Sequence, residues 1–321
     1  MQTKQLGTTD LHLTPIGLGT WAIGGAGWEY GWGTQDEKES IATIHKALDL
    51  GINWIDTAPI YGLGRAEEVV GKATKEMSHR PLVATKCGLV WDKERNIYGR
   101  LKRESVCAEV EASLKRLQVD VIDLYQIHWP DPKNDIEEAW STLADLVKEG
   151  KIRYAAVCNF NVKQIKRIEP IHPVASVQPP YSMLERRIEN NLLPYCAENN
   201  IGVIPYSPLQ KGILTDKFTA KWVQSLPEDD HRRDVDKRFQ EPQLTSNLAF
   251  VESLKKLTQK HGKSVAHAAI AWTLRRPEVT AVIVGARRPD QIEETVEAGD
   301  WELPAEDISS IEDLLEKQIR I

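Results

Sequence analysis

Short apolar runs alternate with segments of helical periodicity along most of the chain, and this alternation constrains the fold more than any other feature. For example, the segment between the apolar runs near residues 15–20 and 53–56 places Ile41, Ile44 and Leu48 on one helical face and ends at Gly51. Parallel strands need such crossovers, and eight of them can close into a barrel. The pattern predicts an α/β fold, a (β/α)8 TIM barrel, with strands near residues 15–20, 53–56, 82–86, 121–127, 154–157, 175–178, 202–206 and 279–284.

The whole chain, residues 1–321, fits a single domain, because α/β barrels often have this length. Residues 3–13 suggest an N-terminal β-hairpin around a Gly7–Asp10 turn. A long loop follows the seventh strand, and its part between Glu228 and Arg238 is densely charged. Residues 213–247 are thus either a solvated surface loop or a lid at the barrel mouth.

Composition excludes several classes of protein. Hydrophobic residues make up 41% and charged residues 27%, which is typical of a soluble globular chain. We see neither an apolar run long enough to span a membrane nor a signal peptide, and we expect a cytoplasmic protein. The four cysteines are widely spaced, which favours reduced thiols over a metal site. A net charge of -6 argues against broad nucleic-acid binding, and the oligomeric state stays open.

Polar side chains follow three of the predicted strands at their carboxyl ends. Asp56 and Tyr61 follow the second strand, Lys86 ends the third, and His128 follows the fourth. Active sites of α/β barrels lie at this rim, so we expect the four side chains to converge. Each residue has a purely structural alternative: Asp56 and Lys86 could form a structural salt bridge, Tyr61 could pack in the core, and His128 could be a buried histidine with satisfied hydrogen bonds. Their joint placement at one rim favours a catalytic site.

These four residue types suit protonation of a carbonyl oxygen. A free tyrosine has a pKa of about 10, and a nearby ammonium group should lower it towards the working range. Asp56 would orient Lys86, while His128 would donate a hydrogen bond to a substrate oxygen. Tryptophans in rim loops suggest an apolar substrate wall, and they are Trp21, Trp28, Trp32, Trp91 and Trp129.

The sequence resembles the aldo-keto reductase superfamily through nearly its whole length, in the branch related to bacterial general stress reductases and potassium-channel β subunits. The matching stretches are Gly17-Leu-Gly-Thr-Trp21, Asp56-Thr-Ala-Pro-Ile-Tyr-Gly62, Ala84-Thr-Lys86, Asp123-Leu-Tyr-Gln-Ile-His-Trp129, Asn159-Phe160, Tyr206-Ser-Pro-Leu209 and Val284-Gly-Ala-Arg287. The resemblance implies an oxidoreductase in which NADPH gives a hydride to an aldehyde or ketone and Tyr61 gives the proton. Trp21 and Trp129 would contact this small-molecule substrate.

The resemblance also implies a set of cofactor residues. Tyr206 matches the aromatic side chain beneath the nicotinamide, and Asn159 and Gln178 match its carboxamide partners. Cys158 stands where the family usually has serine. Arg287 matches a ligand of the adenosine 2'-phosphate, with Arg288 as a competitor. The other implied positions are Gly19, Thr20, Trp21 and Asp56 near the nicotinamide, Ser207, Pro208, Leu209, Lys211 and Gly212 at the pyrophosphate, and Gly285, Ala286, Gln291 and Glu294 towards the adenosine.

Two other functions stay open at this point. Lys86 at the end of a barrel strand would also suit an aldolase that forms a Schiff base. The channel-subunit relatives suggest an NADPH-binding regulatory or redox-sensing subunit with little turnover. The sequence contains no Gly-x-Gly-x-x-Gly run at a strand-to-helix turn, so a Rossmann site has no support. Neither the physiological carbonyl compound nor a strict preference for NADPH over NADH follows from the sequence.

Overall fold

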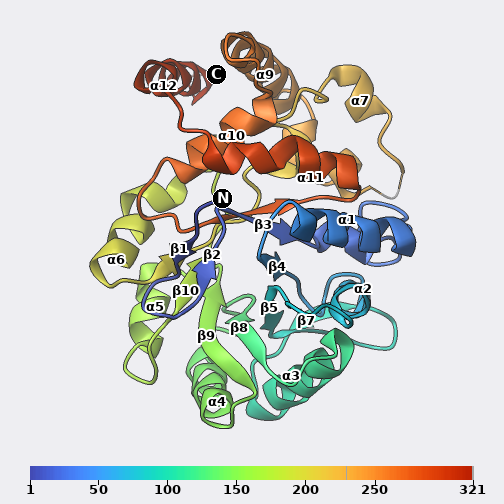
Figure 1. Ribbon diagram of the computed structural model, residues 1–321, viewed down its shortest axis with the longest axis vertical. Helices are drawn as coiled ribbons and strands as arrows, with labels where there is room; N and C mark the ends of the chain where they lie inside the picture. Colours follow the sequence, from blue (N-terminus) through green and yellow to red (C-terminus); the bar gives the residue numbers. More distant parts are fainter. Residues whose placement is uncertain (229, 320–321) are drawn as a thin grey trace.

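The computed structural model describes residues 1–228 and 230–319 and shows a barrel of eight parallel strands surrounded by helices (Figure 1). The order around the sheet is β11-β10-β9-β8-β5-β4-β3-β12. Parallel bridges from Val203 to Val279 and from Tyr206 to Ile283 join the two outer strands and close the ring. In chain order the strands are β3 (Ile16–Gly19), β4 (Trp54–Asp56), β5 (Leu82–Cys87), β8 (Ile122–Ile127), β9 (Ile152–Cys158), β10 (Ser176–Gln178), β11 (Gly202–Val203) and β12 (Val282–Gly285). The predicted barrel is confirmed.

The N-terminal hairpin closes one end of the barrel. Strands β1 (Lys4–Gln5) and β2 (His12–Leu13) pair antiparallel, as predicted. Leu6, Leu11 and Leu13 are buried and pack in one cluster with Trp54 and Ile283 from the barrel strands. This apolar plug fills the amino-terminal end, so the polar site lies at the opposite, carboxyl-terminal rim.

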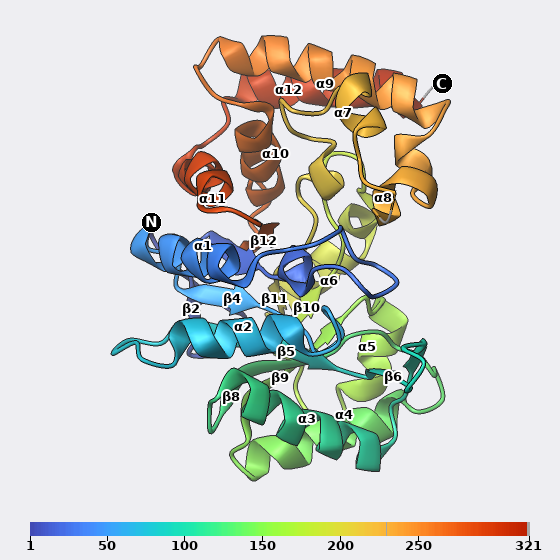
Figure 2. The same cartoon turned by 90° about the vertical axis from the view of Figure 1, so that its right-hand side faces the viewer.

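Helices cover the outside of the barrel and add a further layer at one end. The covering helices are α1 (Glu37–Asp49), α2 (Arg65–Thr74), α3 (Arg103–Leu117), α4 (Ile136–Lys148), α5 (Val162–Ile168), α6 (Leu192–Glu198), α10 (Val265–Leu274) and α11 (Pro289–Val296). Figure 2 shows α9 (Gln243–Gln259) and α12 (Ala305–Ile319) beyond α10, where they pack against each other. Within the described part of the chain, no helix has both the length and the apolar character that crossing a membrane requires.

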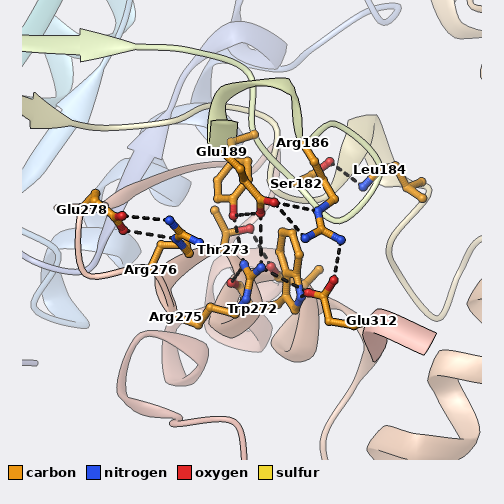
Figure 3. Close-up of polar contacts among 12 residues, drawn as sticks. Ser182, Leu184, Arg186, Glu189, Trp272, Thr273, Arg275, Arg276, Glu278 and Glu312 are labelled. Atoms are coloured by element: carbon orange, nitrogen blue, oxygen red, sulfur yellow. Dashed lines mark hydrogen bonds and ion pairs between the residues drawn. The ribbon is translucent and has the colours of Figure 1, made fainter. Parts of the chain in front are cut away.

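A charged cluster fixes the C-terminal helix to the barrel (Figure 3). Glu312 of α12 accepts hydrogen bonds from Arg186, from Arg275 and from the Trp272 indole nitrogen. The Arg275 guanidinium lies 3.5 Å from the centre of the Trp272 ring, a cation–π contact. Glu189 completes the cluster by pairing with both arginines. The last helix is therefore tied to the segment that follows β10.

Two elements differ from the sequence prediction. Strands β6 (Leu89–Trp91) and β7 (Ile97–Gly99) form an antiparallel hairpin where we expected a rim loop. The interval after β11 is largely folded, since it contains η3 (Gln210–Gly212), α7 (Ala220–Gln224), α8 (His231–Asp234) and η4 (Lys237–Phe239). The rings of Phe218, Trp222 and Phe239 contact one another inside it in edge-on and tilted arrangements. The interval thus has a small apolar core of its own.

Candidate active site

The Lys86 ammonium group lies at the centre of the carboxyl-terminal rim. Its Nζ atom is 2.9 and 2.8 Å from the two carboxylate oxygens of Asp56 and 2.8 Å from the Thr57 carbonyl oxygen. The Tyr61 hydroxyl lies 3.2 Å away. Asp56 and Lys86 end neighbouring strands whose register pairs Asp56 with Ala84, and this register brings the two buried charges together. The predicted convergence of Asp56, Tyr61 and Lys86 is present.

A tight turn after β4 presents Tyr61 to the rim. The turn is closed by hydrogen bonds from Tyr61 N to Ala58 O and from Gly64 N to Pro59 O. Gly62 has a φ of 65°, and a Cβ atom there would lie 2.2 Å from the Gly24 carbonyl oxygen, so only glycine fits. The Trp21 ring lies 5.1 Å from the Tyr61 ring. The phenol is thus held on several sides.

His128 reaches the same place from the end of β8. Its backbone N–H donates to the Cys87 carbonyl at 2.9 Å, and its ring lies edge-on to Tyr61 with centroids 5.9 Å apart. Burial, together with the Lys86 charge, lowers the pKa of His128 well below its ordinary value. The imidazole is therefore neutral at pH 7 and can donate one hydrogen bond.

The pKa of Tyr61 differs from the sequence expectation. We expected Lys86 to lower it, but burial raises the pKa of Tyr61 well above its ordinary value, with further contributions from Asp56 and Cys158. The physical reason is that the paired Asp56 carboxylate offsets the Lys86 charge, while burial opposes formation of any phenolate. The phenol is protonated at rest, the form that donates a proton.

The residues expected at the nicotinamide surround this centre. The Tyr206 hydroxyl donates to Asn159 Oδ1 at 2.9 Å, and Asn159 Nδ2 donates to the His128 carbonyl at 3.0 Å. Gln178 Nε2 donates to Asp56 at 2.8 Å, and the Cys158 thiol lies 3.5 Å from Gln178 Oε1. Both amide oxygens keep acceptor capacity for a carboxamide N–H. Thr20 binds the Asp56 carbonyl, and Gly19 pairs with Gly285 beside buried Ala286.

The expected pyrophosphate segment forms a tight turn after β11. Ser207 and Lys211 have φ values of 59° and 57°, and Gly212 N donates to the Leu209 carbonyl. Lys211 Nζ pairs with Asp236 at 2.9 Å. Burial alone would raise the pKa of that carboxyl group, but hydrogen bonds from Arg238 and Lys211 outweigh burial and lower the pKa well below its ordinary value. Pro208 lies within the same turn. A phosphate group at this turn would share Lys211 with Asp236.

Arg287 occupies the expected adenosine end. Its guanidinium donates to Gln35 Oε1 at 2.8 Å, to the Trp32 carbonyl at 2.9 Å and to the Thr34 carbonyl. Three of its five N–H groups are used in this way, which leaves donors for an anion. Gln291 accepts from the backbone N–H groups of Arg287 and Arg288 at the start of α11. Arg288 itself pairs with Asp290, and Glu294 lies 3.6 Å from Lys217.

The folded interval after β11 reaches the loop that follows β3. Asp230 forms a β-bridge with Trp32, and the Arg232 guanidinium lies 4.3 Å from the centre of the Trp32 ring. The His231 ring meets the Tyr30 ring edge-on. These contacts pack the segment against the protein, so it is not a freely solvated loop, and the lid role stays a prediction. In the sequence, only the charge density of the segment points to Asp230 and Arg232, and neither residue belongs to a recognisable motif.

Three of the five tryptophans expected in the substrate wall lie in one apolar cluster. Trp28, Ala58, Ile60, Tyr61 and Ala66 form its buried part, joined by Trp21, Tyr30, Leu63, Leu89, Trp91 and Ile97. The hairpin β6–β7, missed in the sequence, therefore forms part of this cluster, and a contact with substrate stays a prediction. Trp129 stands apart and is 44% exposed. In the described residues, no group of three or more His, Cys, Asp or Glu side chains is placed to hold a metal ion.

Comparisons with known proteins agree with this geometry. The Aldo/keto reductase family model matches residues 15–316. The aldo-keto reductase YhdN of Bacillus subtilis (strain 168) is 43% identical over 99% of this chain and 95% of its own length. The NADH-specific methylglyoxal reductase of Escherichia coli (strain K12) is 36% identical over 98% of this chain and 99% of its length.

Two solved structures are similar to this chain in both sequence and fold. The glycerol dehydrogenase AKR11B4 from Gluconobacter oxydans is 39% identical with a TM-score of 0.90, covering 100% of this chain and 97% of that one. The holo form of aldo-keto reductase AKR11C1 from Bacillus halodurans is 28% identical with a TM-score of 0.82, covering 98% and 96%.

Proposed function

Since the chain belongs to the aldo/keto reductase family, we propose that it is an NADPH-dependent cytoplasmic enzyme that reduces aldehydes or ketones to alcohols. The observation that carries this proposal is the Lys86 ammonium group, which Asp56 orients and which lies 3.2 Å from the Tyr61 hydroxyl. The donors and acceptors along the rim suit the parts of a dinucleotide, from the Asn159 and Gln178 amides to the Arg287 guanidinium.

In this proposal, the bound nicotinamide supplies the hydride to the carbonyl carbon. Tyr61 gives its hydroxyl proton to the carbonyl oxygen, and Lys86 stabilises the phenolate that remains. Neutral His128 donates a hydrogen bond to the same oxygen and orients the carbonyl group. The aromatic cluster around Trp28 excludes water from the reacting atoms.

The geometry favours this function over a Schiff-base aldolase. Lys86 Nζ is fully buried and already has four oxygen neighbours, two of them carboxylate oxygens. These contacts surround the nitrogen, so it is not free to approach a carbonyl carbon, as a Schiff-base nucleophile must. Borohydride treatment in the presence of a carbonyl substrate should therefore leave Lys86 unmodified.

Substitution of Tyr61 by Phe tests the proposal. Phenylalanine keeps the ring contacts with Trp21 and removes only the hydroxyl, so kcat should fall by at least about 100-fold, in line with loss of a general acid. NADPH binding, followed by quenching of tryptophan fluorescence, should be unchanged. Retained turnover would exclude Tyr61 as the proton donor. Absence of turnover in the unmodified protein, with tight NADPH binding, would favour a regulatory subunit.

The choice of NADPH over NADH rests on Arg287, since a guanidinium group binds a phosphate monoester better than a ribose hydroxyl. The E. coli relative is named NADH-specific, so the two cofactors must be compared directly. Fluorescence titrations with each should give the lower Kd for NADPH.

A further inference from the structure

A carboxylate outside the proposed catalytic group holds the turn that ends β5. Glu109 of α3 accepts a hydrogen bond from the Gly88 backbone N–H at 2.8 Å through Oε2. Its other oxygen accepts from the Ser105 hydroxyl at 3.0 Å. Gly88 has a φ of 91°, and a Cβ atom there would lie 2.6 Å from the Leu101 side chain. The turn therefore has one tightly defined conformation, and Glu109 binds its free N–H group.

This turn is connected to two of the four rim residues, to one through the chain and to the other through a hydrogen bond. Lys86 lies two positions before Gly88 at the end of β5. Between them, the Cys87 carbonyl accepts the hydrogen bond from the His128 backbone N–H at 2.9 Å. A shift of the turn would move the Lys86 side chain and the backbone of His128 together. Both Tyr61 and the carbonyl oxygen of a substrate depend on those positions to within a fraction of an ångström.

We propose that Glu109 is a positioning residue of the reductase site, which acts through the Gly88 N–H group to hold Lys86 and His128 in register. The inference rests on the proposed function, because the effect is read through carbonyl reduction. The hydrogen-bond partners of Glu109 are Gly88 and Ser105, neither of which belongs to the catalytic or cofactor residues described above.

The surroundings of Glu109 make this support sensitive to pH. Burial, opposed by hydrogen bonds from Gly88 and Ser105, raises the pKa of Glu109 to about 7. Cys87 from β5 and Tyr125 from β8 face it, and burial raises the pKa of each well above its ordinary value, so both stay protonated. Arg116 of α3 attracts the negative charge and Glu67 of α2 repels it, and these two pair with each other at 2.7 Å.

The sign of the effect follows from hydrogen-bond strength. A carboxylate accepts a stronger hydrogen bond from an N–H group than a neutral carboxylic acid or amide does. Above pH 7 the ionised Glu109 holds Gly88 firmly, and below pH 7 the protonated form holds it less well. Glu109→Gln imitates the protonated form at every pH, while Glu109→Leu removes the acceptor.

The experiment compares kcat of the unmodified protein and Glu109→Gln between pH 5.5 and 8.5. The ratio of the two values should be near 1 at low pH and rise to roughly fivefold above pH 7, with a midpoint near 7. Glu109→Leu should be slower than Glu109→Gln throughout. The control is Glu111→Gln on the same helix, since Glu111 is exposed and pairs with Lys151; its ratio should be flat and near 1.

A second measurement separates the two proposals. Hydrogen exchange of the Gly88 amide at one pH should be at least about tenfold faster in Glu109→Leu than in Glu111→Gln, because its acceptor is gone. A pH-independent ratio for Glu109→Gln, or unchanged exchange in Glu109→Leu, would overturn the inference. Absence of carbonyl reduction by the unmodified protein would instead overturn the proposed function, and the exchange rate would still decide whether Glu109 holds the turn.

Discussion

At the residue scale, the buried Lys86 ammonium group is paired with the carboxylate of Asp56. An ammonium group has three donors, and here they meet both Asp56 oxygens and the Thr57 carbonyl. Burial, with a further contribution from Asp56, raises the pKa of Tyr61, so the phenol stays protonated. Burial and the Lys86 charge lower the pKa of His128, so the imidazole stays neutral. Both protonation states are the ones that the proposed reduction requires.

Arg287 offers the residue-scale test of cofactor preference. Arg287→Met removes the donors available to a 2'-phosphate, so the Kd for NADPH should rise by about tenfold or more. The Kd for NADH should change much less, because NADH lacks that phosphate. Fluorescence titration measures both, and Arg288→Met is the matched control. An equal loss for both cofactors would mean that Arg287 serves only to hold the Trp32–Gln35 loop.

The convergence of the four rim residues could be predicted from sequence because each lies at the end of an apolar strand or after one, and parallel strands share one rim. The partners of the two cations expected at the cofactor could not be predicted. Lys211 pairs with Asp236, 25 positions away, and Arg287 binds Gln35, 252 positions away. Such pairings depend on how loops meet in space, and no local periodicity encodes that.

At the scale of elements, the interval after β11 contains short helices that its densely charged sequence did not predict. Asp230 and Asp236 accept hydrogen bonds at the starts of α8 and η4, so these acidic residues cap short helices. The β6–β7 hairpin was missed for a related reason. Its strands have three residues each, too few for a periodic signal, and its apolar side chains pack on Trp28 and Tyr61 from distant segments.

Asp236 provides the test of this element. Its carboxylate pairs with Lys211 and Arg238, and it is 8% exposed. Asp236→Asn keeps the side-chain shape but leaves both cations without their partner, which should loosen the interval over the cofactor. The dissociation rate of NADPH, measured by stopped-flow fluorescence, should increase by roughly tenfold. Exposed Glu228 in the same segment serves as the control, through Glu228→Gln. An unchanged dissociation rate in Asp236→Asn would show that the ion pair does not restrain the cofactor.

At the scale of the whole molecule, the C-terminal helix is coupled to the rim through the cluster around Trp272. Arg275 donates to the Tyr181 hydroxyl as well as to Glu312 of α12. The Tyr181 backbone N–H in turn donates to the Tyr206 carbonyl at 3.2 Å. One connected set of contacts therefore runs from the last helix to the aromatic residue expected beneath the nicotinamide.

Glu312→Gln tests how much this cluster stabilises the fold. The substitution removes the negative charge that Arg186 and Arg275 share, and a partly buried, charge-assisted contact of this kind contributes about 1–3 kcal/mol. The free energy of unfolding in urea should fall by that amount, while Glu316→Gln on the exposed face of α12 should change it by less than about 0.5 kcal/mol. Because Tyr61 and Lys86 do not contact the cluster, kcat should stay within about twofold at low temperature. Equal unfolding midpoints for the two variants would show that α12 is held by its apolar contacts alone.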